Sequence, residues 1–407
     1  MITPSFLYLA TTCTGLRAKG VRLCVHPSRN VHRFRAMMPR KFSVLHGSHP
    51  HPHHDESKET AASIDSGSPP TASNKVHQLS SFTGKVVPLG SDFSVRRILP
   101  FAKQRAVGPF VFLDHIGPVA LTEHAMNVGP HPHIGLMTIT YLYEGAILHR
   151  DSTGAEQLVI PGEVNGMVAG KGVTHSERGQ LEDIAPFLSS LQLPPPTGSH
   201  GLQIWMALSK QGQNVPPSFH HGPAVSIDGK YATLVVGQAN GKEQASIPID
   251  PELGSVVYVD LHFPSKEDSF QISNIGGNGT SVSDPSLELG IYVSTGSIQF
   301  QDGWGDLTGT SLDAGNMMVA KVPDATTFQA SIKALSNDAR TAILGGTPLP
   351  EKRHIFWNFV ATSREMVQSA ADAWDRLDRT VFGKVVNEAN DDSIPLPQQN
   401  APARNKS

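Results

Sequence analysis

Short apolar segments separated by turn-forming residues dominate the chain from about residue 77 onward, and this pattern limits the fold more than any other feature. The sequence contains 37 glycines and 31 prolines, which punctuate a chain at turns. A helical bundle would need long segments with a helical period instead. Hydrophobic residues make up 39% of the 407 residues, so a sizeable core is possible. The pattern predicts an all-β body with many turns.

The strand-like segments fall into two groups. The first group, within 77–215, includes PFVFLDH, LMTITYLYEG and GLQIWMALS. The second group, within 216–390, includes YATLVVGQ, SVVYVDLHF and LELGIYVSTG. We expect the segment 211–224 to connect the groups and the glycine- and serine-rich segment 273–286 to form a mobile loop. The sequence therefore predicts two β-rich domains in tandem.

A helical period appears only near the end, in ATSREMVQSAADAWDRLDRTVFGKV. Thr362 and Glu365 form a predicted capping box at its start. Apolar residues then recur every three or four positions: Met366, Ala370, Trp374, Leu377 and Val381. This pattern predicts one amphipathic helix packed on the second domain. The last residues, 391–407, are expected to be a disordered tail.

Residues 1–76 differ in composition from the rest. No acidic residue precedes Asp55, and basic residues are spread among serine, threonine and apolar residues, which is typical of a mitochondrial transit peptide. A disordered basic tail, or a gene model whose true start is Met37 or Met38, would give the same composition. The histidine-, serine- and proline-rich part that follows is expected to be a disordered linker. The expected location is mitochondrial under the first interpretation and cytoplasmic or nuclear otherwise.

Charge and cysteine content exclude several classes of function. A formal net charge of −3 provides no basic surface for direct nucleic-acid contact, and no apolar run is long enough to span a membrane. The two cysteines, Cys13 and Cys24, lie outside the predicted body. A thiolate metal site is thereby excluded there, as is a zinc deaminase, which needs a Pro-Cys-x-x-Cys element.

Two pairs of metal-ligating residue types share the same spacing. His131 and His133 stand in GPHPHIGLMTITYLYEG, and His175 and Glu177 in GKGVTHSERG after two glycines that allow a tight turn. On a strand, residues two apart point to the same face, about 6.5–7 Å apart. On a helix they would diverge. Pairs on neighbouring strands would therefore direct four ligands at one point.

This ligand set suggests a metal centre rather than ordinary core histidines. Three imidazoles and one carboxylate leave an open position on an octahedral ion, which suits one Fe(II), with Mn, Ni, Cu or Zn as substitutes. A lone His-x-His element would indicate ordinary buried or surface histidines. The presence of a second pair with the same spacing favours a metal site. The histidine run 46–54 has no strand-like neighbours, and we interpret it as part of the linker.

Several motifs resemble the pirin family of the cupin superfamily: RRILPF, GPFVFLDHIGP, GPHPHIGLMTITYLYEG, HRDSTG, PGEVNGMVAGKGVTHSE and GLQIWMAL. The resemblance covers 96–208 and continues more weakly to the terminal helix. It implies two tandem jelly-roll (cupin) β-barrels with a C-terminal helix. The N-terminal cupin at 77–215 would bind metal, and the C-terminal cupin at 216–390 would be a metal-free copy, with His262 standing alone.

The resemblance also implies the ligands and the activity. The family's metal ligands fall on His131, His133, His175 and Glu177. The broader cupin motif places a carboxylate where this chain has Met137, so Glu177 becomes the required anionic ligand. Some members are dioxygenases of flavonols such as quercetin. In that activity Glu177 would also be catalytic, by leaving the metal transiently to accept a proton.

A second function is implied by other pirin-like proteins, which act as iron- and redox-dependent transcriptional co-regulators. In that case the partner would be a protein, and the charge state of the metal would alter the surface that the partner recognises. In either case we expect an apolar mouth on the first barrel with a few polar groups. The candidate lining residues are Phe110, Phe112, Met137, Tyr141 and Trp205.

Overall fold

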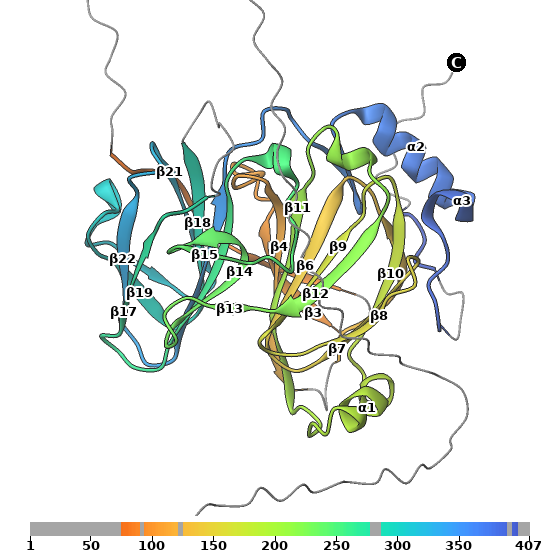
Figure 1. Ribbon diagram of the computed structural model, residues 1–407, viewed down its shortest axis with the longest axis horizontal. Coiled ribbons are helices and arrows are strands. Elements are labelled where there is room, and N and C mark those ends of the chain that lie inside the picture. The colour runs from red at the N-terminus through yellow and green to blue at the C-terminus, as the bar shows by residue number, and fades with distance from the viewer. Residues whose placement is uncertain (1–74, 90–92, 121–124, 277–285, 389–392, 398–407) are drawn as a thin grey trace, which may run out of the picture. The chain divides into compact units, whose positions relative to one another are not determined.

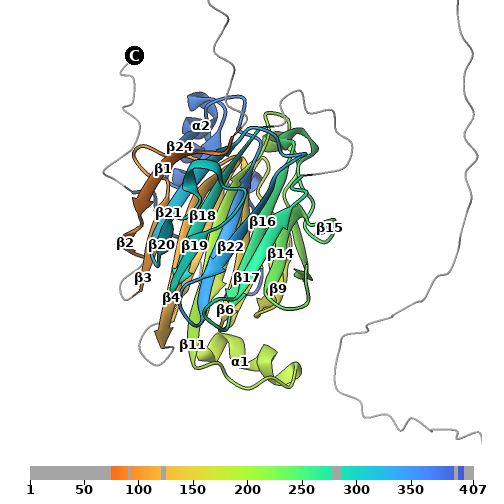
Figure 2. The same cartoon turned by 90° about the vertical axis from the view of Figure 1, so that its left-hand side faces the viewer.

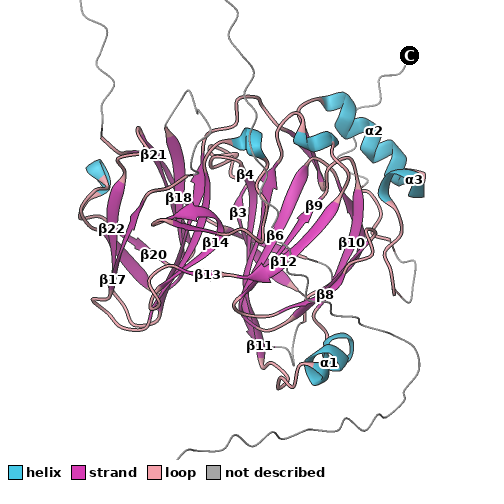
Figure 3. Ribbon diagram, viewed as in Figure 1, coloured by secondary structure: helices cyan, strands magenta, loops and turns pink. Residues whose placement is uncertain are grey.

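The computed structural model describes residues 75–89, 93–120, 125–276, 286–388 and 393–397 (Figure 1). All of them belong to one of the two units into which the chain divides, 69–407. The predicted targeting segment, the histidine run 46–54 and most of the predicted loop 273–286 lie outside the described residues. Strands dominate the described part, and helices cover its ends (Figure 3).

The first barrel consists of two antiparallel sheets that face each other. The larger sheet has the strand order β12-β9-β6-β11-β4-β3-β2, and the smaller has the order β5-β10-β7-β8. The larger sheet comprises β2 (Lys85–Pro88), β3 (Ser94–Leu99), β4 (Phe110–Ala120), β6 (Leu136–Glu144), β9 (Glu163–Val168), β11 (Gly198–Ala207) and β12 (Ser218–Pro223). The smaller comprises β5 (Asn127–His133), β7 (Ile147–Asp151), β8 (Glu156–Val159) and β10 (Val173–Arg178). Helix α1 (Leu181–Ser190) follows β10.

The second barrel repeats this plan. Its larger sheet has the order β1-β21-β18-β23-β16-β14-β13, with β15 paired to β14, and its smaller sheet has the order β17-β22-β19-β20. The larger sheet comprises β1 (His77–Thr83), β13 (Val225–Ser226), β14 (Ala232–Ala239), β15 (Lys242–Glu243), β16 (Val256–Phe263), β18 (Leu287–Thr295), β21 (Asn316–Val322) and β23 (Ala339–Gly346). The smaller comprises β17 (Ser269–Ser273), β19 (Ser297–Phe300), β20 (Ser311–Asp313) and β22 (Gln329–Ala334). The prediction of two tandem jelly-roll barrels is confirmed.

The larger sheets of the two barrels pack against each other through one apolar cluster. On β6, Met137, Ile139 and Tyr141 belong to this cluster, together with Tyr258 and Tyr292 of the second barrel. Side chains alternate along a strand, so the residues between them on β6 face the interior of the first barrel. β6 is therefore buried on both faces from Leu136 to Leu142, with Thr138 and Thr140 as buried polar residues on the side of the barrel interior.

The first described strand lies in the sheet of the second barrel. β1 pairs with β21 along its whole length, whereas the next strand, β2, pairs with β3 of the first barrel (Figure 2). Gly84 stands between β1 and β2, and its amide donates to the carbonyl oxygen of Gly315. The chain therefore adds an edge strand to the larger sheet of the second barrel before it enters the first barrel.

The C-terminal segment packs on the first barrel, so the prediction that it packs on the second is wrong. The hairpin β24 (His354–Phe356) and β25 (Phe359–Ala361) leads into α2 (Arg364–Asp375) and α3 (Arg379–Phe382). Their apolar side chains form one cluster with Ile134, which follows β5, and α3 contacts β10. Figure 1 shows α2 and α3 beside the strands of the first barrel.

The helix itself also differs from its prediction. Ser363, not Thr362, is the N-cap, and its hydroxyl accepts a hydrogen bond from the Met366 amide. The helix ends at Asp375, and Leu377 takes a φ of +52°, which an α-helix does not allow. Leu377 and Val381 are consequently exposed rather than part of the buried face.

No helix in the described part of the chain is both long and apolar enough to cross a bilayer.

Residues 393–397, which were expected to belong to a disordered tail, pack instead on the first barrel. The amide of Ile394 donates to the carbonyl oxygen of Pro130 at 2.8 Å, and the indole of Trp374 donates to the Ile394 carbonyl at 2.9 Å. The C-terminal segment therefore covers the strand that carries the first histidine pair.

Candidate metal centre

Three of the four predicted ligands come together inside the first barrel. β10 pairs antiparallel with β5, with His175 opposite His131 and Val173 opposite His133. One ring nitrogen from each of these three histidines lies within 4.8 Å of the others, and all three side chains are buried. The turn before β10 contains Gly170 at φ +50°, where a Cβ would lie 2.0 Å from the carbonyl oxygen of Val215. Only glycine fits there, so this residue sets the entry of β10.

Hydrogen bonds fix which nitrogen of two histidines is free. The Nδ1 of His131 lies 2.8 Å from the Gly129 carbonyl oxygen, and the Nδ1 of His133 lies 3.1 Å from the Asn358 carbonyl oxygen. A carbonyl only accepts, so each Nδ1 donates its proton and each Nε2 keeps a lone pair. This arrangement is typical of metal-ligating histidines.

The third histidine has a buried nitrogen with nothing to bond to. The Nε2 of His175 has no hydrogen-bond partner among the described residues. Burial lowers the pKa of His131 to about 4 and lowers the pKa of His133 and His175 well below the ordinary value, with further lowering by the neighbouring imidazoles. All three rings are therefore neutral at pH 7, which is the form that binds metal. A buried unpaired nitrogen beside two free lone pairs fits a divalent ion.

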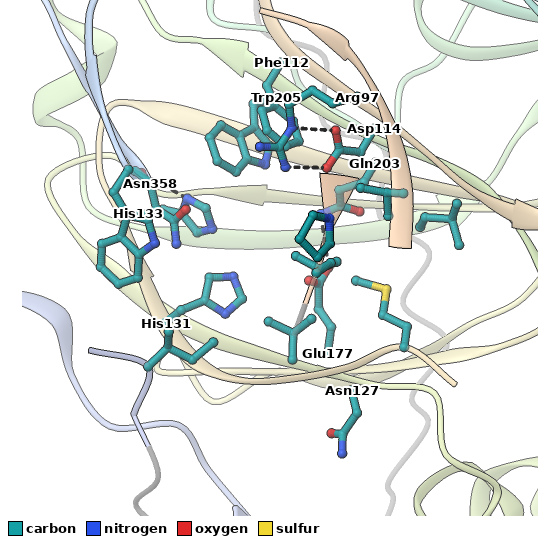
Figure 4. Close-up of a pocket in the computed structure, with 18 residues that line it drawn as sticks. Arg97, Phe112, Asp114, Asn127, His131, His133, Glu177, Gln203, Trp205 and Asn358 are labelled. Atoms are coloured by element: carbon teal, nitrogen blue, oxygen red, sulfur yellow. Dashed lines mark hydrogen bonds and ion pairs between the residues drawn. The ribbon is translucent and has the colours of Figure 1, made fainter. Parts of the chain in front are cut away.

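Glu177 lines the same pocket but stands apart from the three nitrogens. The pairing of β10 with β5 shifts register between His175 and Glu177, which lies opposite Val128. The Glu177 carboxylate instead accepts a hydrogen bond from Gln203 Nε2 at 3.0 Å (Figure 4). Burial raises the pKa of Glu177 to about 7, only partly offset by this hydrogen bond. A cation beside the carboxylate would compensate for its burial.

A cavity of about 540 Å³ opens beside His131, His133 and Glu177. On one wall the rings of Phe112 and Trp205 stack with centroids 3.9 Å apart. Trp205 also meets His133 in a T-shaped contact at a centroid distance of 5.0 Å, so this side of the cavity is aromatic (Figure 4). Phe110, Met137 and Tyr141, three of the five predicted lining residues, pack instead in the cluster between the barrels.

The polar groups of this cavity include an ion pair between a half-buried arginine and a buried aspartate, which the sequence did not single out. Arg97 on β3 bonds Asp114 on β4 through two contacts of 2.9 and 2.8 Å, and its guanidinium lies 4.6 Å from the centroid of the Phe112 ring. Asn127 and Gln203 also line the cavity. The available signal for Arg97 and Asp114 was a pair of opposite charges within two strand-like segments, SVRRIL and FVFLDH.

The C-terminal segment supplies the outer wall. Trp357 and Asn358, from the turn between β24 and β25, line the cavity together with Ile394. Asn358 also provides the carbonyl that orients His133 (Figure 4). Asn358 lies 225 positions after His133, so the end of the chain shapes a site whose first ligands come from the first barrel.

Comparisons with known proteins agree with this structure. The family model described as Pirin matches residues 92–206, and the model described as the Pirin C-terminal cupin domain matches residues 274–379. A pirin-like protein of Caulobacter vibrioides is 34% identical over 318 residues, which cover 75% of this chain and 95% of that protein. A Pseudomonas aeruginosa protein, provisionally named as a quercetin 2,3-dioxygenase, is 29% identical over 330 residues, or 80% of this chain and 90% of that one.

A solved structure shows the same architecture. A quercetin 2,3-dioxygenase from Acinetobacter baumannii superposes with a TM-score of 0.64 at 28% identity, covering 81% of this chain and 98% of the other. Both barrels, a histidine cluster in the first of them and two matching family models lead to one conclusion. This chain belongs to the pirin family of bicupins.

Proposed function

We propose that this protein is a dioxygenase that uses one Fe(II) ion and acts on planar aromatic substrates of the flavonol type. The observation that carries the proposal is the junction of three neutral, buried imidazoles with a cavity that has a stacked aromatic wall. The similarity to a quercetin 2,3-dioxygenase supports the same substrate class. His131, His133, His175 and Glu177 would hold the ion.

Each wall of the cavity has a role in this proposal. The stacked pair Phe112 and Trp205 lines one side of the cavity, where its apolar ring surface would pack against an aromatic substrate. Trp357 and Ile394 line the cavity on the side of the C-terminal segment and would limit the access of water to a bound substrate. When bound, the metal ion supplies Lewis acidity toward the substrate oxygen and an electron for dioxygen chemistry.

Glu177 is suited to accept the proton of a substrate hydroxyl group. It lines the cavity, and Gln203 holds its carboxylate in place. Burial raises the pKa of Glu177 to about 7 when no cation lies beside it, so a carboxylate that leaves the ion transiently could hold a proton near neutral pH. In this proposal Glu177 would serve both as the anionic ligand and, after leaving the ion, as the base.

The test is turnover of a flavonol by protein loaded anaerobically with Fe(II). We expect the absorbance of quercetin to bleach while oxygen is consumed, and we expect His175→Ala to lose both signals. His262→Ala is the matched control, because His262 is an exposed histidine of the second barrel. Loaded protein that leaves a panel of flavonols unchanged and consumes no oxygen would refute the proposal.

A further inference from the structure

Two buried polar residues lie beside the histidine cluster, on the next strand of the same sheet, and have no role in the proposed reaction. His149 and Asp151 lie on β7, where His149 is opposite Glu177 and Asp151 is opposite His175 on β10. Asp151 is completely buried and His149 is 5% exposed. Buried charged groups are costly unless they are fully bonded, so the partners of this pair show what it does.

The hydrogen bonds of Asp151 fix the proton on His149. One carboxylate oxygen, Oδ1, accepts from the Thr153 amide at 2.8 Å, the Thr153 hydroxyl at 2.6 Å and the Ala155 amide at 3.2 Å. The other, Oδ2, lies 3.0 Å from His149 Nε2. A carboxylate accepts hydrogen bonds, so Nε2 of His149 carries the proton and Nδ1 of the same ring keeps a lone pair.

That lone pair faces the third histidine of the cluster. His149 Nδ1 and His175 Nδ1 are 3.5 Å apart, which is a long hydrogen bond. Two lone pairs or two protons at this distance would repel, so His175 must carry its proton on Nδ1. Its Nε2 is then the free nitrogen, which agrees with the buried and unpartnered state of that atom. Phe219 stacks on the His149 ring at a centroid distance of 4.6 Å and holds its plane.

We propose that Asp151 and His149 are positioning residues, which lock His175 in the tautomer that binds a divalent metal ion. His131 and His133 are oriented by neutral backbone carbonyls, whereas His175 is oriented by a chain that ends in an anion. An anion at the end of such a chain raises the basicity of the ligand as well as fixing its ring. The inference rests on the proposed metal site but not on the flavonol activity.

Asp151→Asn tests the chain while keeping its shape. The three donors at Oδ1 hold the amide oxygen there, so the amide nitrogen takes the position of Oδ2 and donates to His149 Nε2. His149 must then carry its proton on Nδ1, and His175 must carry its own on Nε2. The substitution therefore reverses both tautomers and blocks the ligand nitrogen. His149→Phe keeps the ring stack on Phe219 but removes the acceptor.

The readout is binding of the metal alone, measured with Ni(II) or Zn(II) in competition with a chelator, together with the visible spectrum of Co(II)-loaded protein. We expect each variant to bind about 10–100-fold more weakly and to shift the Co(II) bands. The double variant should bind no more weakly than the weaker single variant, because both act through one chain. Asp260→Asn is the matched control: Asp260 is a buried carboxylate of the second barrel, paired with Arg340. It should leave metal affinity and spectrum unchanged.

The possible outcomes distinguish the hydrogen-bond chain Asp151–His149–His175 from the metal site itself. Wild-type protein that binds no ion would refute the site. If the wild-type protein binds the ion and a folded Asp151→Asn variant has an affinity within twofold of it, only the proposed role of the hydrogen-bond chain is refuted. Equal weakening by Asp260→Asn would also overturn it, since the effect would then be general destabilisation. If His149→Phe does not fold, Asp151→Asn decides the question by its affinity and spectrum.

Discussion

Glu388 ties the C-terminal segment to a strand that carries two of the predicted ligands. On β10, Ser176 and Arg178 alternate with His175 and Glu177. The Glu388 carboxylate accepts from the Arg178 guanidinium at 2.8 and 3.3 Å and from the Ser176 hydroxyl. The side chains of this ion pair are only 12% and 6% exposed, so water screens it weakly. We expect Glu388→Gln to release the segment.

The size of the effect follows from the burial of the pair. Removing one partner of a buried ion pair costs about 3–5 kcal/mol, because the other charge is left uncompensated. Glutamine still accepts a hydrogen bond from Arg178, so the lower limit of about 3 kcal/mol applies. Since about 1.4 kcal/mol corresponds to a factor of ten, the segment should undock roughly 100-fold more often.

Hydrogen exchange at Ile394 measures this opening directly, because its amide bonds the Pro130 carbonyl only when the segment is docked. We expect that amide to exchange roughly 100-fold faster in Glu388→Gln. The matched control is Glu267→Gln, which removes the same charge from the exposed pair with Lys333 and should change little. Unchanged protection of Ile394 in Glu388→Gln would refute the reasoning.

Three further predictions address the site, the interface between the barrels and the extension. Glu177→Gln should weaken Fe(II) retention about tenfold or more, measured by elemental analysis after dialysis, because it removes the anionic ligand; full iron content would contradict this. At the interface between the barrels, His115 of β4 bonds the Tyr292 hydroxyl of the second barrel and the imidazole of His200 on β11. Burial, with repulsion from His200, lowers the pKa of His115 to about 3, and burial lowers the pKa of His200 to about 4. The unfolded state therefore binds more protons below pH 6.5, so the free energy of unfolding should fall as the pH drops from about 6.5 to about 4. Urea titrations should show a shallower fall in His200→Gln, and equal slopes would argue against this source. Deleting 1–74 should leave metal content and thermal stability unchanged, and loss of bound iron would point to the histidine run at 46–54.

The histidine pairs were predictable because their geometry is local. A period of two residues places His131 with His133 on one face wherever the segment is a strand. The pairing of His175 with His131 needed only that two such strands be neighbours. The place of Glu177 was less predictable, since a register shift separates it from His175 and Gln203, on a different sheet, holds its carboxylate.

The lining of the cavity depended on features that no strand pattern reveals. Phe110 and Phe112 have the same parity, yet only Phe112 faces the cavity. An irregularity in the pairing of β4 with β11 separates them, because Trp205 lies opposite Phe112 and Met206 opposite Phe110. Met137 has the hydrophobicity of a pocket residue, but it faces the second barrel. A single sequence predicts alternation along a strand, but not which face becomes an interface between domains.

The C-terminal segment packs on the first barrel, and this arrangement has a consequence for synthesis in the cell. A ribosome releases the N-terminal barrel first, and domains generally fold in that order. Here the wall around His133 includes Asn358 and Ile394, which are among the last described residues to emerge. The proposed metal centre is therefore complete only when translation is nearly finished, and a chain that ended before Asn358 would lack the carbonyl group that orients His133, more than two hundred codons upstream.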